Sequence, residues 1–134
     1  MPEVRVAARA PILALAFAAC LSGCFWRYSR PIYAISGAML LDGTPRIPIE
    51  SAVVIVAEGR IAAIGTAGEV RVPDGARRIA VHGRFLFPLK ADQPIRVGGP
   101  ADLMVCEVNP ARDPEYSRKI VGRMESGRWT QYPH

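Results

Sequence analysis

The sequence predicts an all-β fold, a small β-sandwich, in a single domain. Short β-prone apolar runs recur along the chain and are separated by clusters of Gly, Asp and Pro. After the first two dozen residues, no segment longer than eight residues keeps the 3.6-residue apolar period of an amphipathic helix. A length of 134 residues, half of them apolar and 22% charged, leaves room for one globular domain.

The first strands are expected around two turn sequences. Residues 32–41 are β-prone and end at the turn cluster Asp42-Gly43-Thr44-Pro45. Residues 52–57 form a continuous apolar run, and Glu58-Gly59 separates them from a second run at residues 60–65. The pattern predicts one strand followed by a β-hairpin.

The remaining strands are shorter. Two segments flank His82-Gly83, which places His82 in a predicted hairpin, and another strand ends at Asn109-Pro110. A closing hairpin turns at Ser126-Gly127, and only a single helical turn is expected, at residues 114–118. The expected strands are residues 77–81, 84–87, 101–108, 119–125 and 128–132.

Residues 1–23 are expected to be an export signal outside the domain. Arg5 and Arg9 form a basic start, and the apolar stretch PILALAFAACLSG that follows is shorter than the roughly twenty residues of a membrane-spanning helix. Leu21-Ser22-Gly23-Cys24 then resembles the lipobox of bacterial lipoproteins. Cys20 ends a weaker copy of that pattern.

The lipobox resemblance implies lipid on Cys24, cleavage after Gly23 and acylation of the new amino terminus. Because each buried CH₂ contributes roughly 0.8 kcal/mol, several acyl chains would hold the protein on a membrane. Residues 24–31 would form a membrane-proximal tether in the bacterial cell envelope, and the absence of Asp after Cys24 favours the outer membrane, facing the periplasm. The alternatives are an uncleaved N-terminal anchor and a start codon assigned too far upstream.

Charge and cysteine content exclude some functions. Removal of the signal lowers the net charge from +5 to +4, and no cluster of basic residues lies beyond the tether, so no nucleic-acid function is expected. The mild basicity fits solvation, or attraction to an anionic membrane. Cys106 is alone in the apolar run 103–106, where a cysteine is usually a small buried hydrophobe.

The β-segments resemble the composite β-sandwich domain of metal-dependent amidohydrolases, the imidazolonepropionase and dihydroorotase relatives. The resemblance of the first half lies in YAISGAMLLDG (33–43), AVVIVAEGRIAAIG (52–65), VPDGA (72–76) and GRFLFP (83–88). In the second half it lies in GGPADLMV (98–105), Asn109-Pro110 and IVGRMESGR (120–128). The resemblance implies that residues 32–134 unite the two ends of the family's chain in one domain.

In that family a (β/α)₈ barrel with the catalytic metal site lies between these two ends. Its first strand would follow Pro88 with a His-x-His pair, but this chain has a short bridge at residues 89–97 instead. Lys90 and Asp92 match the family's metal-site residues only by type. The resemblance therefore implies that the barrel is absent.

No catalytic, metal-binding or cofactor-binding residue is assigned, and no cofactor is expected. A metal-activated water requires about three protein ligands, whereas the mature chain offers only His82, in a turn, and His134, at the carboxyl terminus. Asp102 matches an aspartate that is structural in the family.

The run 52–57 is apolar on both faces, so without a barrel some apolar surface is expected to be exposed for a partner protein or for self-association. Three interpretations remain open. The chain is a lipid-anchored, non-catalytic binding or structural module; or it supplies the β-domain to an amidohydrolase barrel on a separate chain; or it is the degenerate product of an internal deletion.

Overall fold

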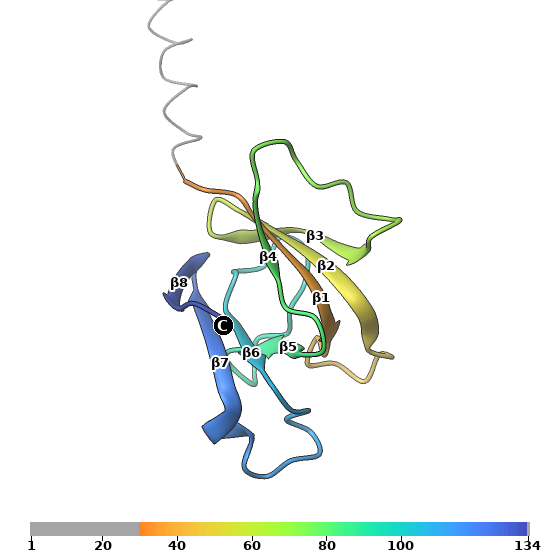
Figure 1. Ribbon diagram of the computed structural model, residues 1–134, viewed down its shortest axis with the longest axis vertical. Helices are drawn as coiled ribbons and strands as arrows, with labels where there is room; N and C mark the ends of the chain where they lie inside the picture. Colours follow the sequence, from red (N-terminus) through yellow and green to blue (C-terminus); the bar gives the residue numbers. More distant parts are fainter. Residues whose placement is uncertain (1–29, 134) are drawn as a thin grey trace, which may run out of the picture. The chain divides into compact units, whose positions relative to one another are not determined.

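The computed structural model describes residues 30–133, which form an all-β domain (Figure 1). The predicted fold class is confirmed. Residues 31–134 belong to one compact unit. The expected signal peptide, the lipid-bearing Cys24, most of the expected tether and the terminal His134 lie outside the described residues.

Eight strands and one short 3₁₀ helix, η2 (Tyr116–Lys119), are present within residues 30–133. The strands are β1 (Tyr33–Leu40), β2 (Ile49–Ala57), β3 (Arg60–Thr66), β4 (Arg77–Ala80), β5 (Phe85–Pro88), β6 (Leu103–Cys106), β7 (Ile120–Glu125) and β8 (Arg128–Gln131). The predicted hairpins β2–β3 and β7–β8 are confirmed. Over the same residues, no helix has the length and hydropathy needed to span a bilayer.

The strands form one sheet in the order β3-β2-β1-β5-β6-β7-β8, with β4 also beside β1. Strand β1 pairs antiparallel with β2 along one edge. Its other edge is shared by two parallel neighbours, β4 along residues 33–36 and β5 along residues 39–40. Strand β1 therefore pairs with three other strands.

The arrangement of β4 and β5 corrects the prediction of a hairpin at His82. These two strands lie end to end along β1, and the turn His82-Gly83 joins them. Gly37 lies at the break in β1 between the two pairings, with a φ of +95°, and a Cβ at this position would overlap the His82 imidazole. His82 is thus an exposed turn residue that packs over a glycine.

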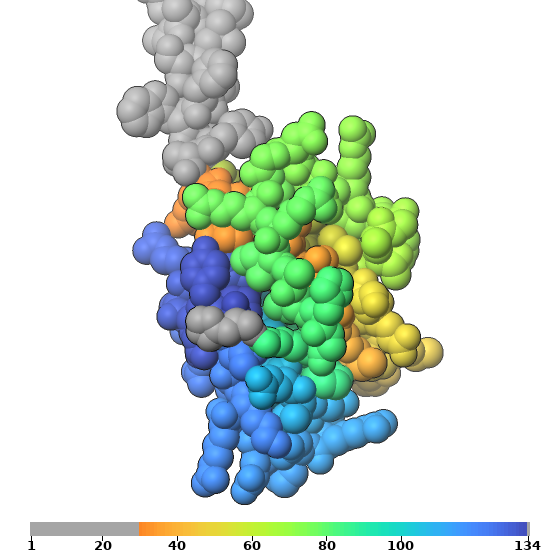
Figure 2. Space-filling view, viewed as in Figure 1, coloured from red at the N-terminus to blue at the C-terminus, as the bar shows by residue number. Residues whose placement is uncertain are grey.

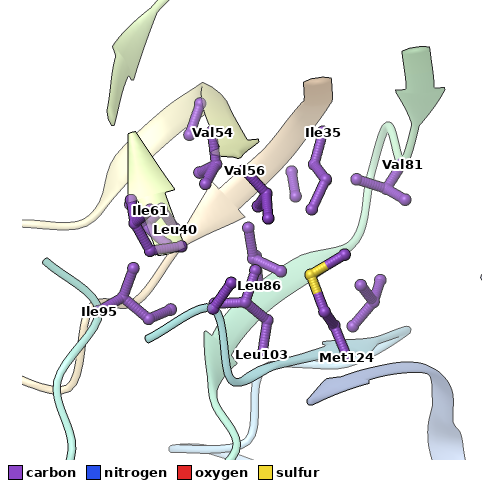
Figure 3. Packing of buried hydrophobic residues seen from close by; sticks show 14 of the residues in the cluster. Ile35, Leu40, Val54, Val56, Ile61, Val81, Leu86, Ile95, Leu103 and Met124 are labelled. Atoms are coloured by element: carbon purple, nitrogen blue, oxygen red, sulfur yellow. The ribbon is translucent and has the colours of Figure 1, made fainter. Parts of the chain in front are cut away.

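The sheet bends so that its two halves enclose one core, which gives the domain its sandwich character (Figure 3). Along each strand alternate residues point to this core, because side chains in a strand alternate between its faces. The side chains that meet there include Ile35, Leu40, Val54, Val56 and Ile61 from β1, β2 and β3, and Leu86, Leu103 and Met124 from β5, β6 and β7.

The second apolar face of β2 is covered by the chain itself. Val53 and Ile55 are buried with Ala34 of β1, and Val70 and Val72 pack against them. These valines belong to the segment between β3 and β4, which lies over β1 and β2 in Figure 2. Both apolar faces of β2 are therefore covered, and sequence periodicity does not reveal this because it does not show that a loop folds back over the strand.

The bridge at residues 89–97 is integrated into the domain. The Leu89 N–H donates to the Asp102 carbonyl at 3.0 Å, and the Ile95 N–H donates to the Asp42 carbonyl at 2.9 Å. The Ile95 side chain is 5% exposed and belongs to the main core. The bridge residues therefore contribute to the packing of the sandwich.

Candidate functional site at the end of strand β5

An apolar groove with a volume of about 430 Å³ lies beside the carboxyl end of β5. We call it the β5 groove. Its floor contains Phe87 and Met104, both nearly buried, and its rim contains the half-buried Leu41 and Leu89. The lining residues are Leu41, Gly43, Phe87, Pro88, Leu89, Ala91, Met104, Pro110, Ala111 and Tyr116.

The register of β5 and β6 places the floor residues. Phe87 is directly opposite Met104 in this antiparallel pair, so both side chains project from the same face of the sheet. Cys106, two residues further along β6, is on that face as well and is fully buried. The opposite face carries Leu86 and Leu103 into the main core. Strands β5 and β6 are therefore apolar on both faces.

The segment 107–119 forms one wall of the groove. The edge of the Phe87 ring meets the Tyr116 ring, with 5.9 Å between their centroids and 83° between their planes. The Cys106 thiol donates to the Tyr116 carbonyl with 3.4 Å between Sγ and O. Asn109 Oδ1 accepts the Ala111 N–H at 2.9 Å and closes an Asx turn. These contacts hold the wall against the floor.

Asp113 stabilises the same wall through a salt bridge and a backbone hydrogen bond. The backbone N–H of Glu115, 2.8 Å from Oδ1, and the Lys119 ammonium, 3.1 Å from Oδ2, lower the pKa of Asp113. A lowered pKa stabilises the folded wall at a pH above the ordinary aspartate value of about 3.9. This stabilisation is lost as the pH falls through the lowered pKa.

The residues considered from sequence as metal-site candidates do not come together. Lys90 and Asp92 are exposed on the bridge, and His82 is exposed in its turn. Among residues 30–133, no three His, Cys, Asp or Glu side chains are grouped so that they could hold a metal ion. Asp102 is structural, since its Oδ1 accepts the Ser126 N–H at 2.8 Å.

Comparison with solved structures finds partial likenesses. A molinate hydrolase aligns at 29% identity over 44% of this chain and 13% of its own, with a TM-score of 0.41. A candidate prolidase from Bifidobacterium longum aligns at 18% identity over 43% of this chain and 15% of its own, with a TM-score of 0.41. An uncharacterized protein aligns at 28% identity over 43% of this chain and 14% of its own, with a TM-score of 0.38.

The chain thus spans about one seventh of the length of these proteins, and TM-scores below 0.5 do not establish a shared fold. No known family profile matches the chain. No curated protein matches it either. The resemblance to amidohydrolases rests on the sequence motifs.

Sequence reasoning did not find the β5 groove. Leu41, Leu89 and Tyr116 come from three separate connections, and they meet only because β1, β5 and β6 are neighbours in the sheet. The available signal was the apolar run Phe87-Pro88-Leu89, which continues past the end of a strand.

Proposed function

We propose that the chain is a lipid-anchored binding module of the bacterial cell envelope, built on an amidohydrolase-like β-domain and without a catalytic site of its own. The observation that carries this proposal is the β5 groove. It is an open depression with a packed apolar floor and a wall held by hydrogen bonds, and concave, mostly apolar depressions of this size are typical of binding sites.

The groove fits apolar side chains of a protein partner. Leu41, Leu89 and Ala91 offer aliphatic contact at its rim, and the Phe87 ring lies below them. Its lining contains no Lys, Arg, Asp or Glu, so a charged ligand would lose its hydration there without a compensating partner. We therefore assign the groove to an apolar segment of an envelope protein, with a second copy of this chain as the competing occupant.

One observation favours a second function, the β-domain subunit of an amidohydrolase whose barrel is on another chain. The groove adjoins Pro88 and Leu89, and the Leu89 N–H contacts the Asp102 carbonyl. By the sequence resemblance, the barrel would be inserted between these two points. A barrel chain seated there would cover the groove. In that case, the purified complex would carry stoichiometric metal and hydrolyse cyclic amides.

The groove predicts a position-specific crosslink in cells. A photoreactive phenylalanine at Ala91, on the groove rim, is expected to capture one partner protein, whereas the same group at the exposed Ala67 is expected to capture none. Leu89→Glu should reduce the Ala91 crosslink by at least tenfold, because a carboxylate in the apolar contact loses its hydration. Leu89 is half-buried outside the main core, so the thermal midpoint is expected to change little.

The same experiment separates the alternatives. A crosslinked product of twice the chain mass indicates self-association, and a partner with a His-x-His barrel strand indicates the enzyme subunit. Crosslinks at Ala91 that persist in Leu89→Glu would refute the groove as the binding site. Cys24→Ser tests the anchor, since it is expected to abolish incorporation of labelled fatty acid.

A further inference from the structure

A second exposed apolar surface lies at the opposite end of the bridge. Ile47 is 89% exposed and Val97 is 61% exposed. Within the described part of the chain, Tyr132 is the other large hydrophobic residue with high exposure. Arg46 and Arg96 are the sequence neighbours of the two aliphatic residues and are exposed with them. We call these four residues, Arg46, Ile47, Arg96 and Val97, the loop patch.

Two separate connections form the loop patch. Arg46 and Ile47 belong to the loop between β1 and β2, and the other pair ends the bridge. All four line one depression of about 380 Å³, with Leu40, Ile49, Ile64 and Ile95 among its other lining residues. The hydrogen bond from the Ile95 N–H to the Asp42 carbonyl, 2.9 Å, ties the two connections together.

The β1–β2 loop holds Ile47 outward. Pro45 and Pro48 flank Arg46-Ile47, and each proline restricts both its own backbone and the residue before it. At the start of the loop, Asp42 Oδ1 accepts the Thr44 N–H at 2.8 Å and the Thr44 hydroxyl at 2.6 Å. The exposure of Ile47 therefore belongs to a braced loop.

The positive charge of the loop patch favours an anionic partner. Asp42 is the acidic residue among those lining the depression, and its carboxylate is already engaged with Thr44. Glu50, close by in sequence, lines a different depression, next to Arg84. The two arginines take part in no ion pair recorded for residues 30–133. A second copy of the chain would bring four guanidinium groups together, so the patch is suited to an anionic partner that also accepts aliphatic side chains.

We propose that the loop patch docks onto an anionic lipid bilayer. Ile47 and Val97 insert below the headgroups, while Arg46 and Arg96 bind lipid phosphates. Aliphatic side chains next to basic ones match the two layers of such a surface, an acyl boundary under a layer of negative charge. This inference rests on the proposed envelope location, but not on acylation of Cys24 or on the β5 groove.

The chain between Cys24 and β1 is long enough for the loop patch and the amino terminus to reach the same bilayer. The loop patch lies beyond the end of β1, whose eight residues extend over roughly 25 Å from Tyr33. Whatever their conformation, the nine residues from Cys24 to the start of β1 span at most about 30 Å. The domain can therefore lie with β1 along the bilayer while its amino terminus stays anchored there.

Binding to vesicles tests the proposal without the lipid anchor. The probe is residues 24–134 with Cys24→Ser, which contain the whole compact unit, with circular dichroism as the check on folding. Sedimentation with vesicles of phosphatidylcholine and phosphatidylglycerol is expected to show binding that pure phosphatidylcholine vesicles do not support. Ile47→Ser should weaken this binding by at least about tenfold, since the burial of one isoleucine side chain is lost. Ile47→Leu should bind the vesicles as strongly as the unchanged chain.

The arginines have a charge-matched control. Arg46→Gln with Arg96→Gln should weaken binding by about 25-fold, roughly fivefold for each charge near an anionic surface. Arg112→Gln with Arg118→Gln removes the same charge from exposed positions in the segment 107–119 and should weaken binding by less than threefold. Equal losses in the two pairs would overturn the proposal, as would undiminished binding of Ile47→Ser or no preference for the anionic lipid.

These outcomes are independent of the groove. A chain that fails to bind vesicles but keeps its Leu89-dependent crosslink removes this inference and leaves the binding module standing. A chain that binds vesicles through the loop patch but gives no groove crosslink removes the β5 groove as a binding site and leaves the membrane-docking inference standing.

Discussion

Ile95→Ala is expected to lower the free energy of unfolding by about 2–5 kcal/mol. Ile95 is 5% exposed, and its side chain packs with core residues such as Leu40 and Leu103. Truncation would remove buried methyl and methylene groups and leave a cavity that the surrounding strands cannot close. Urea unfolding of residues 24–134, followed by circular dichroism, would measure the loss.

Ile47→Ala is the matched control for this change. The same atoms are removed from a side chain that is 89% exposed, so the free energy of unfolding is expected to change by less than about 0.5 kcal/mol. If the two variants were equally stable, the bridge would not be part of the core. Residues 89–97 would then be an unpacked connection between the two halves of the sandwich, as expected of a deletion product.

Gly127→Ala is expected to destabilise the domain by about 2–5 kcal/mol, from backbone strain and overpacking together. Gly127 has a φ of +78°, a conformation that residues with a Cβ rarely adopt. An added Cβ would lie 2.6 Å from the Cα of Gly59, and a backbone atom cannot move aside as a side chain end can. The contact joins the turns of the two hairpins, so relief of the clash would separate β2–β3 from β7–β8.

Gly75→Ala separates strain from steric overlap. Gly75 has a similar φ of +80°, but a Cβ there would meet no atom within 4 Å. This variant should therefore lose only the cost of the backbone conformation, about 1–2 kcal/mol. Equal urea midpoints for Gly127→Ala and Gly75→Ala would show that the approach of the two turns is not as close as described.

The sequence predicts the strands well because their signals are local. The run 52–57 and the turn residues Glu58-Gly59 predict the hairpin that β2 and β3 form, with β2 starting three residues earlier, at Ile49. The turn at Ser126-Gly127 is predicted for the same reason. Asp42-Gly43 is likewise a turn, closed by the Asx contact with Thr44.

The failures concern relations between distant segments. The turn at His82 has the residues of a hairpin, but β4 and β5 both pair with β1, and only tertiary structure decides this pairing. The cover that Val70 and Val72 place over β2 depends on a loop folding back, which periodicity does not encode. The β5 groove likewise exists only when the segment 107–119 packs onto β5 and β6.

Together these contacts describe a β-domain whose apolar faces are largely covered by its own segments. The bridge fills the core through Ile95, the segment between β3 and β4 covers the outer face of β2, and the segment 107–119 shields much of the outer face of β5 and β6. What remains exposed is confined to defined places, among them the β5 groove and the loop patch. Because little apolar surface is exposed outside such places, the proposal of a binding module is favoured over that of a degenerate remnant.

Equilibrium unfolding in urea is the most direct test of whether this domain folds cooperatively by itself. Residues 24–134 with Trp26→Phe retain one tryptophan, Trp129, which packs edge-on against Tyr33 with 6.1 Å between ring centroids. Its fluorescence therefore reports tertiary packing, while circular dichroism reports the strands. The account predicts a monomer with one cooperative transition and coincident midpoints for both probes. Broad or separate transitions, or strand signal without a fixed tryptophan environment, would contradict it.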